Sequence, residues 1–85
     1  MEVIFRKSFQ KDFDKLQPKL QDTTEERVKL FKENPYDQRL DLHPLRGNWE
    51  GFYSIDIAFN LRGLFYFKEN CAIFVRVGTH SQLYK

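Results

Sequence analysis

Two histidines, His43 and His80, supply the side chains best suited to acid–base chemistry in this chain of 85 residues. With an unperturbed pKa of about 6.5, an imidazole can donate or accept a proton near neutral pH. His80 precedes Tyr84 by four residues, or one helical turn, so a turn of helix after Gly78 would bring both rings to one side at the sheet edge. The pair is either part of an active site or a packed tyrosine beside a solvated histidine, and the residues alone leave both open.

An arginine and an aspartate are predicted to meet on adjacent strands. Residues 51–59 and 61–67 are rich in β-favouring side chains, and alternation turns Asp56 away from the apolar face of the first strand. Arg62 takes the matching face of the second strand, on a surface that the helices do not cover. Its guanidinium can bind phosphate oxygens through two donors at once. The alternative is a cross-strand ion pair that contributes only a fraction of a kcal/mol.

The chain is predicted to open with a strand and a helix. The strand-like run Glu2–Arg6 is followed by Ser8, a suitable N-cap residue. Apolar residues then recur at helical spacing as far as Leu20, which indicates an amphipathic helix that Pro18 kinks or interrupts. The apolar stripe is typical of a core-facing surface.

A second helix and three strands complete the fold. The helix is expected to start near Asp22, in a capping-box-like pair with Glu25, and to stop at Asn34-Pro35. Two strands follow over 51–59 and 61–67, and a hairpin at 68–70 joins the second of them to a third over 71–77. No helix intervenes between these strands, which predicts an antiparallel sheet. The expected fold class is α+β: an N-terminal strand and two helices packed on one face of a twisted, mainly antiparallel sheet, with a short C-terminal helical turn.

Length and composition indicate one small domain, residues 1–85, outside the secretory pathway. An aromatic content of 16% can form a core without disulfides, and the single cysteine, Cys71, cannot form an internal bridge, which fits a reducing cytosol. No signal segment or membrane-spanning apolar run is evident, so a cytoplasmic location without a membrane partner is expected. The net charge of +2 does not by itself indicate a nucleic-acid partner, although residues 43–85 hold five basic and three acidic residues.

Four sequence blocks follow one another along the chain: HPLRGNWEG (43–51), YSIDI (53–57), NLR (60–62) and GTHSQLY (78–84). Together they resemble the RelE/YafQ-like toxins of bacterial type II toxin–antitoxin systems, in the RelE/ParE superfamily. The resemblance covers nearly the full chain, because the N-terminal strand and two helices also fit. It implies a RelE-like fold. Trp49, within the first block, is interpreted as a packing residue.

The resemblance implies an mRNA interferase, a ribosome-dependent endoribonuclease that cuts translated messages without a metal or other cofactor. Its partners would be mRNA, the ribosome and a cognate antitoxin that silences it in a hetero-oligomeric complex. A cationic, partly aromatic sheet face invites a disordered acidic segment that folds on contact. The antitoxin is therefore expected to cover Arg62 or His80.

The resemblance also implies a role for each candidate residue. Metal-free cleavage needs a base for the 2′-hydroxyl proton, an acid for the leaving 5′ oxygen and a cation on the phosphate. His43 is the expected base, His80 the acid and Arg62 the phosphate ligand, while Tyr84 orients or stacks on the substrate. Further substrate contacts are assigned to Arg46, Asn60 and Arg76.

Three positions depart from the YafQ-type pattern. Asp56, Asn60 and Leu61 stand where histidine, aspartate and tryptophan are common in the family. Either Asp56 replaces the missing proton acceptor, or the chemistry relies on His43 and Arg62 as in arginine-bearing relatives, or the activity is weak. The proton acceptor is thus left open between Asp56 and His43.

Two other functions are compatible with the same fold. A ParE-like toxin that binds a protein target such as DNA gyrase would not need His80. A non-catalytic, antitoxin-binding domain would tolerate the loss of both histidines and of Arg62. The presence of His43 and His80 together argues against the gyrase-binding alternative.

Overall fold

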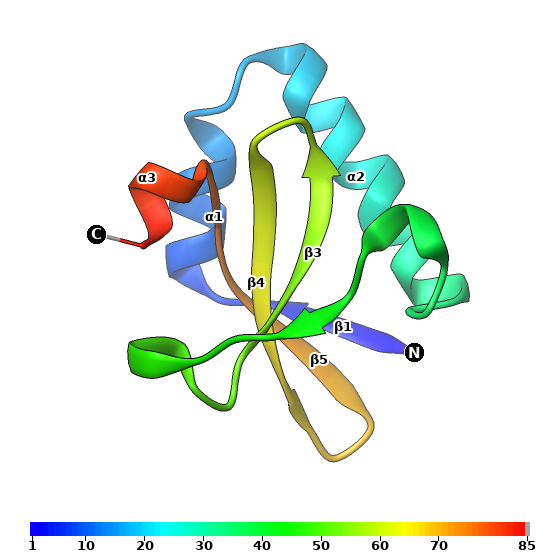
Figure 1. Cartoon of the computed structure of the whole chain (residues 1–85). Helices are drawn as coiled ribbons and strands as arrows, with labels where there is room; N and C mark the ends of the chain where they lie inside the picture. Colours follow the sequence, from blue (N-terminus) through cyan, green and yellow to red (C-terminus); the bar gives the residue numbers. More distant parts are fainter. Residues whose placement is uncertain (85) are drawn as a thin grey trace.

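The computed structural model describes residues 1–84, which form a sheet with helices on one side (Figure 1). The first element is a strand, and two α-helices follow before the rest of the sheet is built. In chain order the elements are β1 (Glu2–Phe5), α1 (Lys7–Asp14), α2 (Pro18–Glu33), the 3-10 helix η1 (Gln38–Leu40), β2 (His43–Pro44), the 3-10 helix η2 (Gly47–Trp49), β3 (Tyr53–Ala58), β4 (Leu61–Lys68), β5 (Cys71–Gly78) and α3 (His80–Leu83).

The sheet has the strand order β1-β5-β4-β3-β2. β1 pairs with β5 in parallel, because α1 and α2 intervene between β1 and the rest of the sheet, and every other pair is antiparallel. The predicted α+β class and mainly antiparallel sheet are confirmed. The short strand β2, at the edge beyond β3, was not expected from the sequence, because two residues give no periodic pattern.

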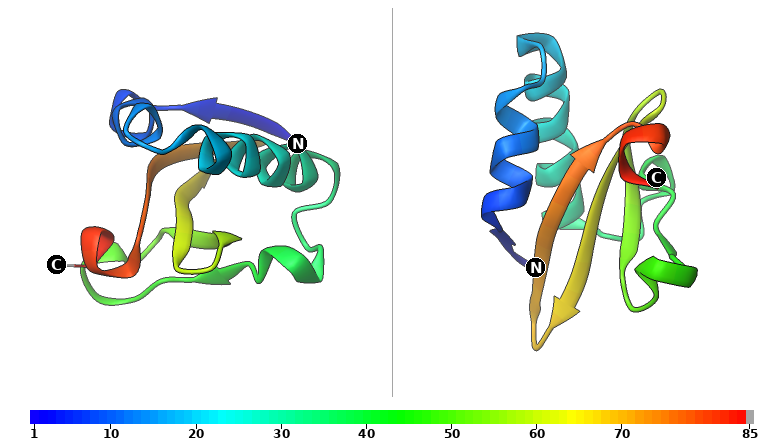
Figure 2. Two further views of the ribbon diagram at one scale, coloured as in Figure 1. Left: turned by 90° about the horizontal axis from the view of Figure 1, so that it is seen from above. Right: turned by 90° about the vertical axis from the view of Figure 1, so that its left-hand side faces the viewer.

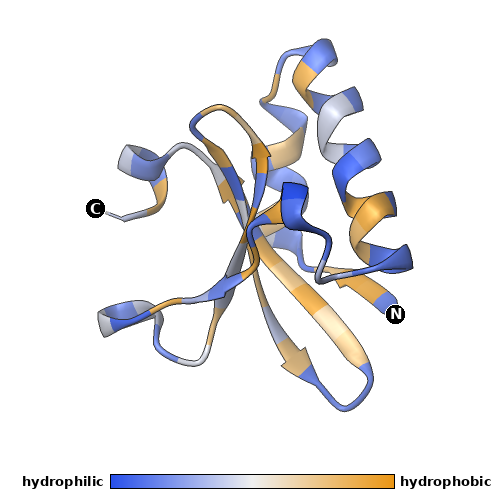
Figure 3. Ribbon diagram, turned by 45° about the vertical axis from the view of Figure 1, so that its right-hand side comes forward, coloured by the Kyte–Doolittle hydropathy of each residue, from blue (hydrophilic) through white to orange (hydrophobic). Residues whose placement is uncertain are grey.

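The two long helices cover one face of the sheet: α1 packs against β5, and α2 packs against β3. The core between these layers is aromatic, and Phe31 of α2 places its ring 5.0 Å from Phe65 and 5.4 Å from Phe74. All three side chains are fully buried, and each contributes about 1.5–3 kcal/mol through removal from water. Figure 3 shows the same division, with apolar residues along the strands and polar ones on the outer turns of α2.

The helix boundaries differ from the predicted ones in three respects. α1 ends at Asp14, and Pro18 begins α2, so Leu20 belongs to α2 rather than to the first helix; proline suits the first turn because its missing N–H needs no partner there. Ser8 lies inside α1, whose N-cap residue is Arg6, and its hydroxyl donates to the Val75 carbonyl. Asp22 lies inside α2 and caps nothing.

The end of α2 and the C-terminal turn agree with the sequence. α2 stops at Glu33, directly before Asn34-Pro35. The last strand leads into α3, which Thr79 and Gln82 close with a reciprocal capping box. A Cβ at Gly78 would come within 2.9 Å of the Gln82 Oε1 and 3.3 Å of the Leu83 Cδ2, so a larger residue there would displace the Gln82 side chain from the capping box. Within residues 1–84, no helix has the length and apolarity needed to cross a membrane.

Candidate active site

The face of β3 and β4 that the long helices leave uncovered carries the residues selected from the sequence. In Figure 2 the helices α1 and α2 form one layer, and η2 and α3 lie on the opposite side of the sheet. Register places Asp56 of β3, Arg62 of β4 and Gly78 of β5 in one row across this open face. The predicted proximity of Asp56 and Arg62 is therefore confirmed.

The ion pair in this row is loose. The Arg62 Nε lies 3.9 Å from the Asp56 Oδ1, and the two side chains are 35% and 40% exposed. A pair with this separation and exposure contributes at most about 1 kcal/mol. The guanidinium is held beside Asp56 and still has donors facing solvent, as a phosphate-binding group must.

A second row on the same face contains His43 of β2 and Ser54 of β3. The His43 Nδ1 lies 2.8 Å from the Asp41 carbonyl oxygen, and its Nε2 lies 3.1 Å from the Ser54 hydroxyl. Because a carbonyl oxygen only accepts, Nδ1 carries a hydrogen. In the neutral imidazole Nε2 is then the acceptor for the buried Ser54 hydroxyl, and this is the tautomer that a base requires.

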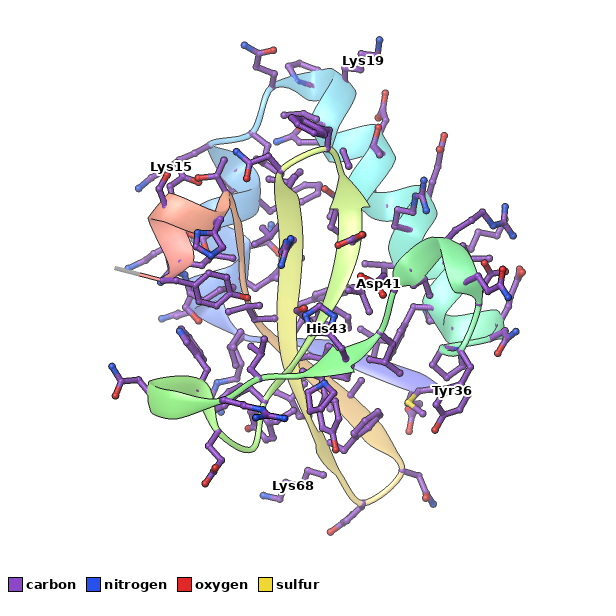
Figure 4. The ribbon with its side chains drawn as sticks, viewed as in Figure 1. Lys15, Lys19, Tyr36, Asp41, His43 and Lys68 are labelled. Atoms are coloured by element: carbon purple, nitrogen blue, oxygen red, sulfur yellow. The ribbon has the colours of Figure 1, made fainter. Side chains whose placement is uncertain are left out.

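The carboxylate of Asp41 stands behind the same imidazole. Its Oδ2 lies 3.9 Å from the His43 Nδ1, and both residues belong to the segment that enters β2 (Figure 4). This negative charge would stabilise the imidazolium that forms when His43 takes a proton. Sequence reasoning missed both Asp41 and Ser54, since each is recognised only through the two-residue strand β2.

The two rows are close neighbours. Ser54 and Asp56 are two residues apart on one face of β3, which separates the rows by about 7 Å along the strand. A phosphate group bound at Arg62 would therefore lie within reach of groups in both rows.

The C-terminal helix places a second histidine at this face. His80 begins α3 two residues after Gly78, the register partner of Arg62. Its ring centroid lies 4.7 Å from that of Tyr84 at an interplanar angle of 61°, so the two rings do share one side. His80 is exposed and Tyr84 is half-buried, with a buried hydroxyl that has no hydrogen-bond partner among residues 1–84.

Trp49 joins the His43 segment to the His80 helix. Its Nε1–H donates to the Leu83 carbonyl of α3 at 3.3 Å, and its ring lies 5.1 Å from Phe52, which in turn meets Tyr66 on β4 at 5.5 Å. Trp49 packs as the sequence suggested. It also ties η2 to α3, a link that no sequence spacing reveals because the partners are 34 residues apart.

The comparisons with known proteins identify the family. The family model for YafQ, described as a bacterial toxin of type II toxin–antitoxin systems, matches residues 1–85. The chain belongs to the YafQ toxin family. It is accordingly the toxin component of a type II system.

Solved structures agree with this assignment. A copper-bound mutant toxin from Helicobacter pylori is 29% identical, with 99% of each chain covered and a TM-score of 0.74. YafQ from Escherichia coli is 19% identical over 99% of this chain and 98% of its own, with a TM-score of 0.83, and YafQ in the DinJ–YafQ toxin–antitoxin complex gives 19% identity, 99% and 97% coverage and a TM-score of 0.80. At such low identity the Escherichia coli structures show a common RelE-like fold. No curated protein sequence matches the chain.

The three residues assigned to substrate are placed differently in this YafQ-family toxin. Register continues the His43–Ser54 row through Leu64 to Arg76, but the Arg76 Nε donates to the Asp12 Oδ2 at 2.6 Å, so its guanidinium is engaged by α1. Arg46 is an exposed residue at the start of η2. Asn60 occupies the β3–β4 turn with a φ of 57°, a left-handed conformation that asparagine tolerates better than most residues.

Other reactive groups contribute little to the site. Partial burial and the nearby Glu2 carboxylate raise the pKa of the Cys71 thiol, which disfavours the thiolate needed for nucleophilic chemistry. Among the described residues there is no cluster of three or more histidine, cysteine, aspartate or glutamate side chains able to hold a metal ion.

Proposed function

We propose that this toxin is an mRNA interferase that cuts translated messages on the ribosome through its own side chains. The observation that carries the proposal is the shared open face, which presents a partly exposed guanidinium at Arg62, a histidine whose Nδ1 donates to a backbone carbonyl, His43, and an exposed histidine, His80. Membership of the YafQ family supports it.

Arg62 is assigned to the scissile phosphate. Its planar guanidinium can donate two hydrogen bonds to phosphate oxygens and stabilise the charge that grows on them during cleavage. Asp56 orients the guanidinium from 3.9 Å without consuming its donors. Asp56 acts in this scheme as a positioning residue rather than as the base.

His43 is assigned the role of base. The substrate 2′-hydroxyl replaces the Ser54 hydroxyl at Nε2, which costs about 1–3 kcal/mol because the buried Ser54 hydroxyl loses its partner. Nε2 takes the 2′ proton as the 2′ oxygen attacks phosphorus. The imidazolium that results is stabilised by the Asp41 carbonyl and carboxylate.

His80 is assigned the role of acid. As the bond from phosphorus to the 5′ oxygen breaks, protonated His80 gives its proton to that oxygen. The products are a 2′,3′-cyclic phosphate and a 5′-hydroxyl end. The Tyr84 ring packs against His80 in an edge-to-face arrangement and restricts its orientation.

A cognate antitoxin is proposed as the regulatory partner, in a hetero-oligomeric complex in the cytoplasm. Support comes from relatives of the same fold that are solved as toxin–antitoxin complexes, DinJ–YafQ from Escherichia coli and RelBE2 from Mycobacterium tuberculosis. Co-expression with the product of the neighbouring gene and affinity purification test this partner. Failure of the two proteins to co-purify would count against it.

The function is tested by inducing the wild type and an Arg62→Ala, His80→Ala double variant in bacteria. Growth, protein synthesis and the 5′ ends of a translated reporter mRNA are followed in one culture. We expect the wild type to stop translation with new cuts inside reading frames, and the double variant to do neither. Growth arrest by both proteins without cuts would point instead to a protein target such as DNA gyrase.

A further inference from the structure

The β3–β4 hairpin presents an aromatic ring to solvent beside the candidate site. Phe59 at its tip is 102% exposed, as open as in an unfolded chain, whereas Phe65 and Phe74 on the flanking strands are fully buried. Leaving a phenylalanine in water forgoes the stabilisation that burial would give. A ring held at the end of a rigid hairpin is suited to contact a flat partner.

Phe59 borders a hollow of about 530 Å³ that also reaches the phosphate-binding arginine. This volume lies within the range of small-ligand sites, roughly 300–1,000 Å³. The hollow opens between the hairpin and the pair α2 and η1, which lie beside β3 (Figure 1). Its charged lining residues are Arg27, Arg39, Asp56 and Arg62, so cations exceed anions by two.

The two arginines outside the catalytic rows are held in place. The Arg27 Nη1 donates to the Arg39 carbonyl at 3.1 Å. Arg39 donates from Nε and Nη2 to the Asp37 carboxylate at 3.0 Å and 2.9 Å, although its side chain is still 66% exposed. A guanidinium has five N–H donors, so these contacts fix both groups and leave donors for another anion.

We propose that this hollow, defined by Phe59, Arg27 and Arg39, binds the nucleotide next to the scissile one in single-stranded RNA, with its base stacked on Phe59 and its phosphate on the two arginines. The proposal rests on the mRNA interferase function above and extends its substrate site. Arg62 is the shared element, since it belongs to the open face and lines the hollow.

The chemistry of the hollow favours RNA over a protein segment. A protein that buried Phe59 would need further apolar groups around it, yet four of the eight lining side chains are charged. Bases stack on aromatic rings regardless of sequence, and fixed guanidinium groups match phosphates. An exposed ring between cationic side chains meets both requirements of a single-stranded nucleic acid.

The test is equilibrium binding of a fluorescein-labelled, single-stranded RNA whose 2′ positions are methylated, so that the wild type cannot cleave it. Phe59→Ala should weaken binding by about tenfold, within the range found for one stacked base. Phe59→Trp should bind within about twofold of the wild type, and Phe59→Leu should behave like alanine. An Arg27→Gln, Arg39→Gln double variant should lower the salt dependence of binding by about 0.7 in log–log slope, the value for one phosphate of a single strand.

Tyr36→Ala is the matched control. Tyr36 is 76% exposed and lies away from the β3–β4 hairpin in Figure 4, so its loss should leave RNA binding unchanged. Thermal unfolding of each variant verifies folding, which an exposed side chain should not affect. Equal binding by the wild type and all Phe59 variants would overturn the proposal, and so would retention of full affinity by Phe59→Leu.

The outcomes separate this proposal from the function on which it rests. Wild-type cleavage of translated mRNA together with Phe59-independent binding overturns the nucleotide site alone. Phe59-dependent binding without cleavage supports the site and overturns the catalytic assignment. Absence of measurable RNA binding by the wild type overturns the site whatever the cleavage assay shows.

Discussion

Two arginines on neighbouring strands, Arg62 and Arg76, show how partners decide what a cation can do. Their side chains are almost equally exposed, at 35% and 34%. Arg62 meets a half-exposed Asp56 at 3.9 Å, whereas Arg76 binds Asp12 with two donors, at 2.6 Å and 3.4 Å. Asp12 also accepts from the Val77 backbone N–H at 3.1 Å.

The difference teaches that exposure alone does not identify a ligand-binding arginine. At the contact between β5 and α1, the guanidinium of Arg76 holds the helix on the sheet. On the open face of β3 and β4, the guanidinium of Arg62 is only weakly restrained by Asp56. We therefore expect substitutions in the first region to change stability and substitutions in the second to change chemistry.

The largest effect is expected for Arg62→Ala. Loss of the phosphate cation should lower the cleavage rate of a translated mRNA by about 10²- to 10³-fold in a reconstituted translation system. The free energy of unfolding should fall by no more than about 1 kcal/mol, because the ion pair is loose. Arg62→Lys should recover part of the rate, since lysine supplies charge without the two-donor geometry. A cleavage rate within twofold of wild type for Arg62→Ala would remove this residue from the site.

Asp12→Ala should show the opposite pattern. It removes the partner of Arg76 and leaves the Val77 N–H without its acceptor, which should lower the free energy of unfolding by about 2 kcal/mol. Urea titration measures this loss. The cleavage rate per folded molecule should match the wild type, and a rate loss comparable to that of Arg62→Ala would erase the distinction between the two regions.

A smaller effect is expected where the open face is joined to α3. Trp49→Phe keeps an aromatic ring beside Phe52 but loses the donor to the Leu83 carbonyl, at a cost of about 1 kcal/mol. Hydrogen exchange over 80–83 should become faster, and kcat should fall several-fold with little change in KM, because His80 is less well positioned. Unchanged exchange over α3 would show that Trp49 only packs.

The smallest effect concerns Arg39, the third paired arginine. The Arg39 side-chain and backbone hydrogen bonds lower the pKa of Asp37 to about 2 from its usual 3.8. Because the folded pKa lies below the unfolded one, the stabilisation is fully present above about pH 4 and is lost as the pH falls towards 2. The difference in Tm between the wild type and Asp37→Asn should therefore shrink over that range. A constant difference would mean that the pair contributes nothing.

Period-two alternation was sufficient to predict that Asp56 and Arg62 share a face, but not their register. Regular pairing from Ala58 and Leu61, which flank the two-residue turn, would set Ile57 opposite Arg62, and a bulge between Asp56 and Ala58 makes Asp56 the register partner instead. The spacing of His80 and Tyr84 likewise determines their shared side once Gly78 admits the turn.

Long-range contacts account for what the sequence did not predict. The partner of Arg76 is Asp12 of α1, which lies 64 residues away in the sequence. A register shift between Leu64 and Phe65 of β4 also changes the pairing with β5 just before Arg76. The hydrogen bonds of His43 depend on a strand of two residues. The hollow beside Phe59 joins the β3–β4 hairpin to α2 and η1, and no local period connects the hairpin to either helix.

The central claim is that protein side chains on the open face catalyse attack of the 2′ oxygen on the neighbouring phosphorus. The most direct measurement is the chemical nature of the ends produced when the purified toxin cuts a translated mRNA. We expect a 5′-hydroxyl on the downstream fragment and a 2′,3′-cyclic phosphate on the upstream one, with neither formed by the Arg62→Ala, His80→Ala double variant. A 5′-phosphate on the downstream fragment would contradict the account, because it would require water rather than the 2′ oxygen as the nucleophile.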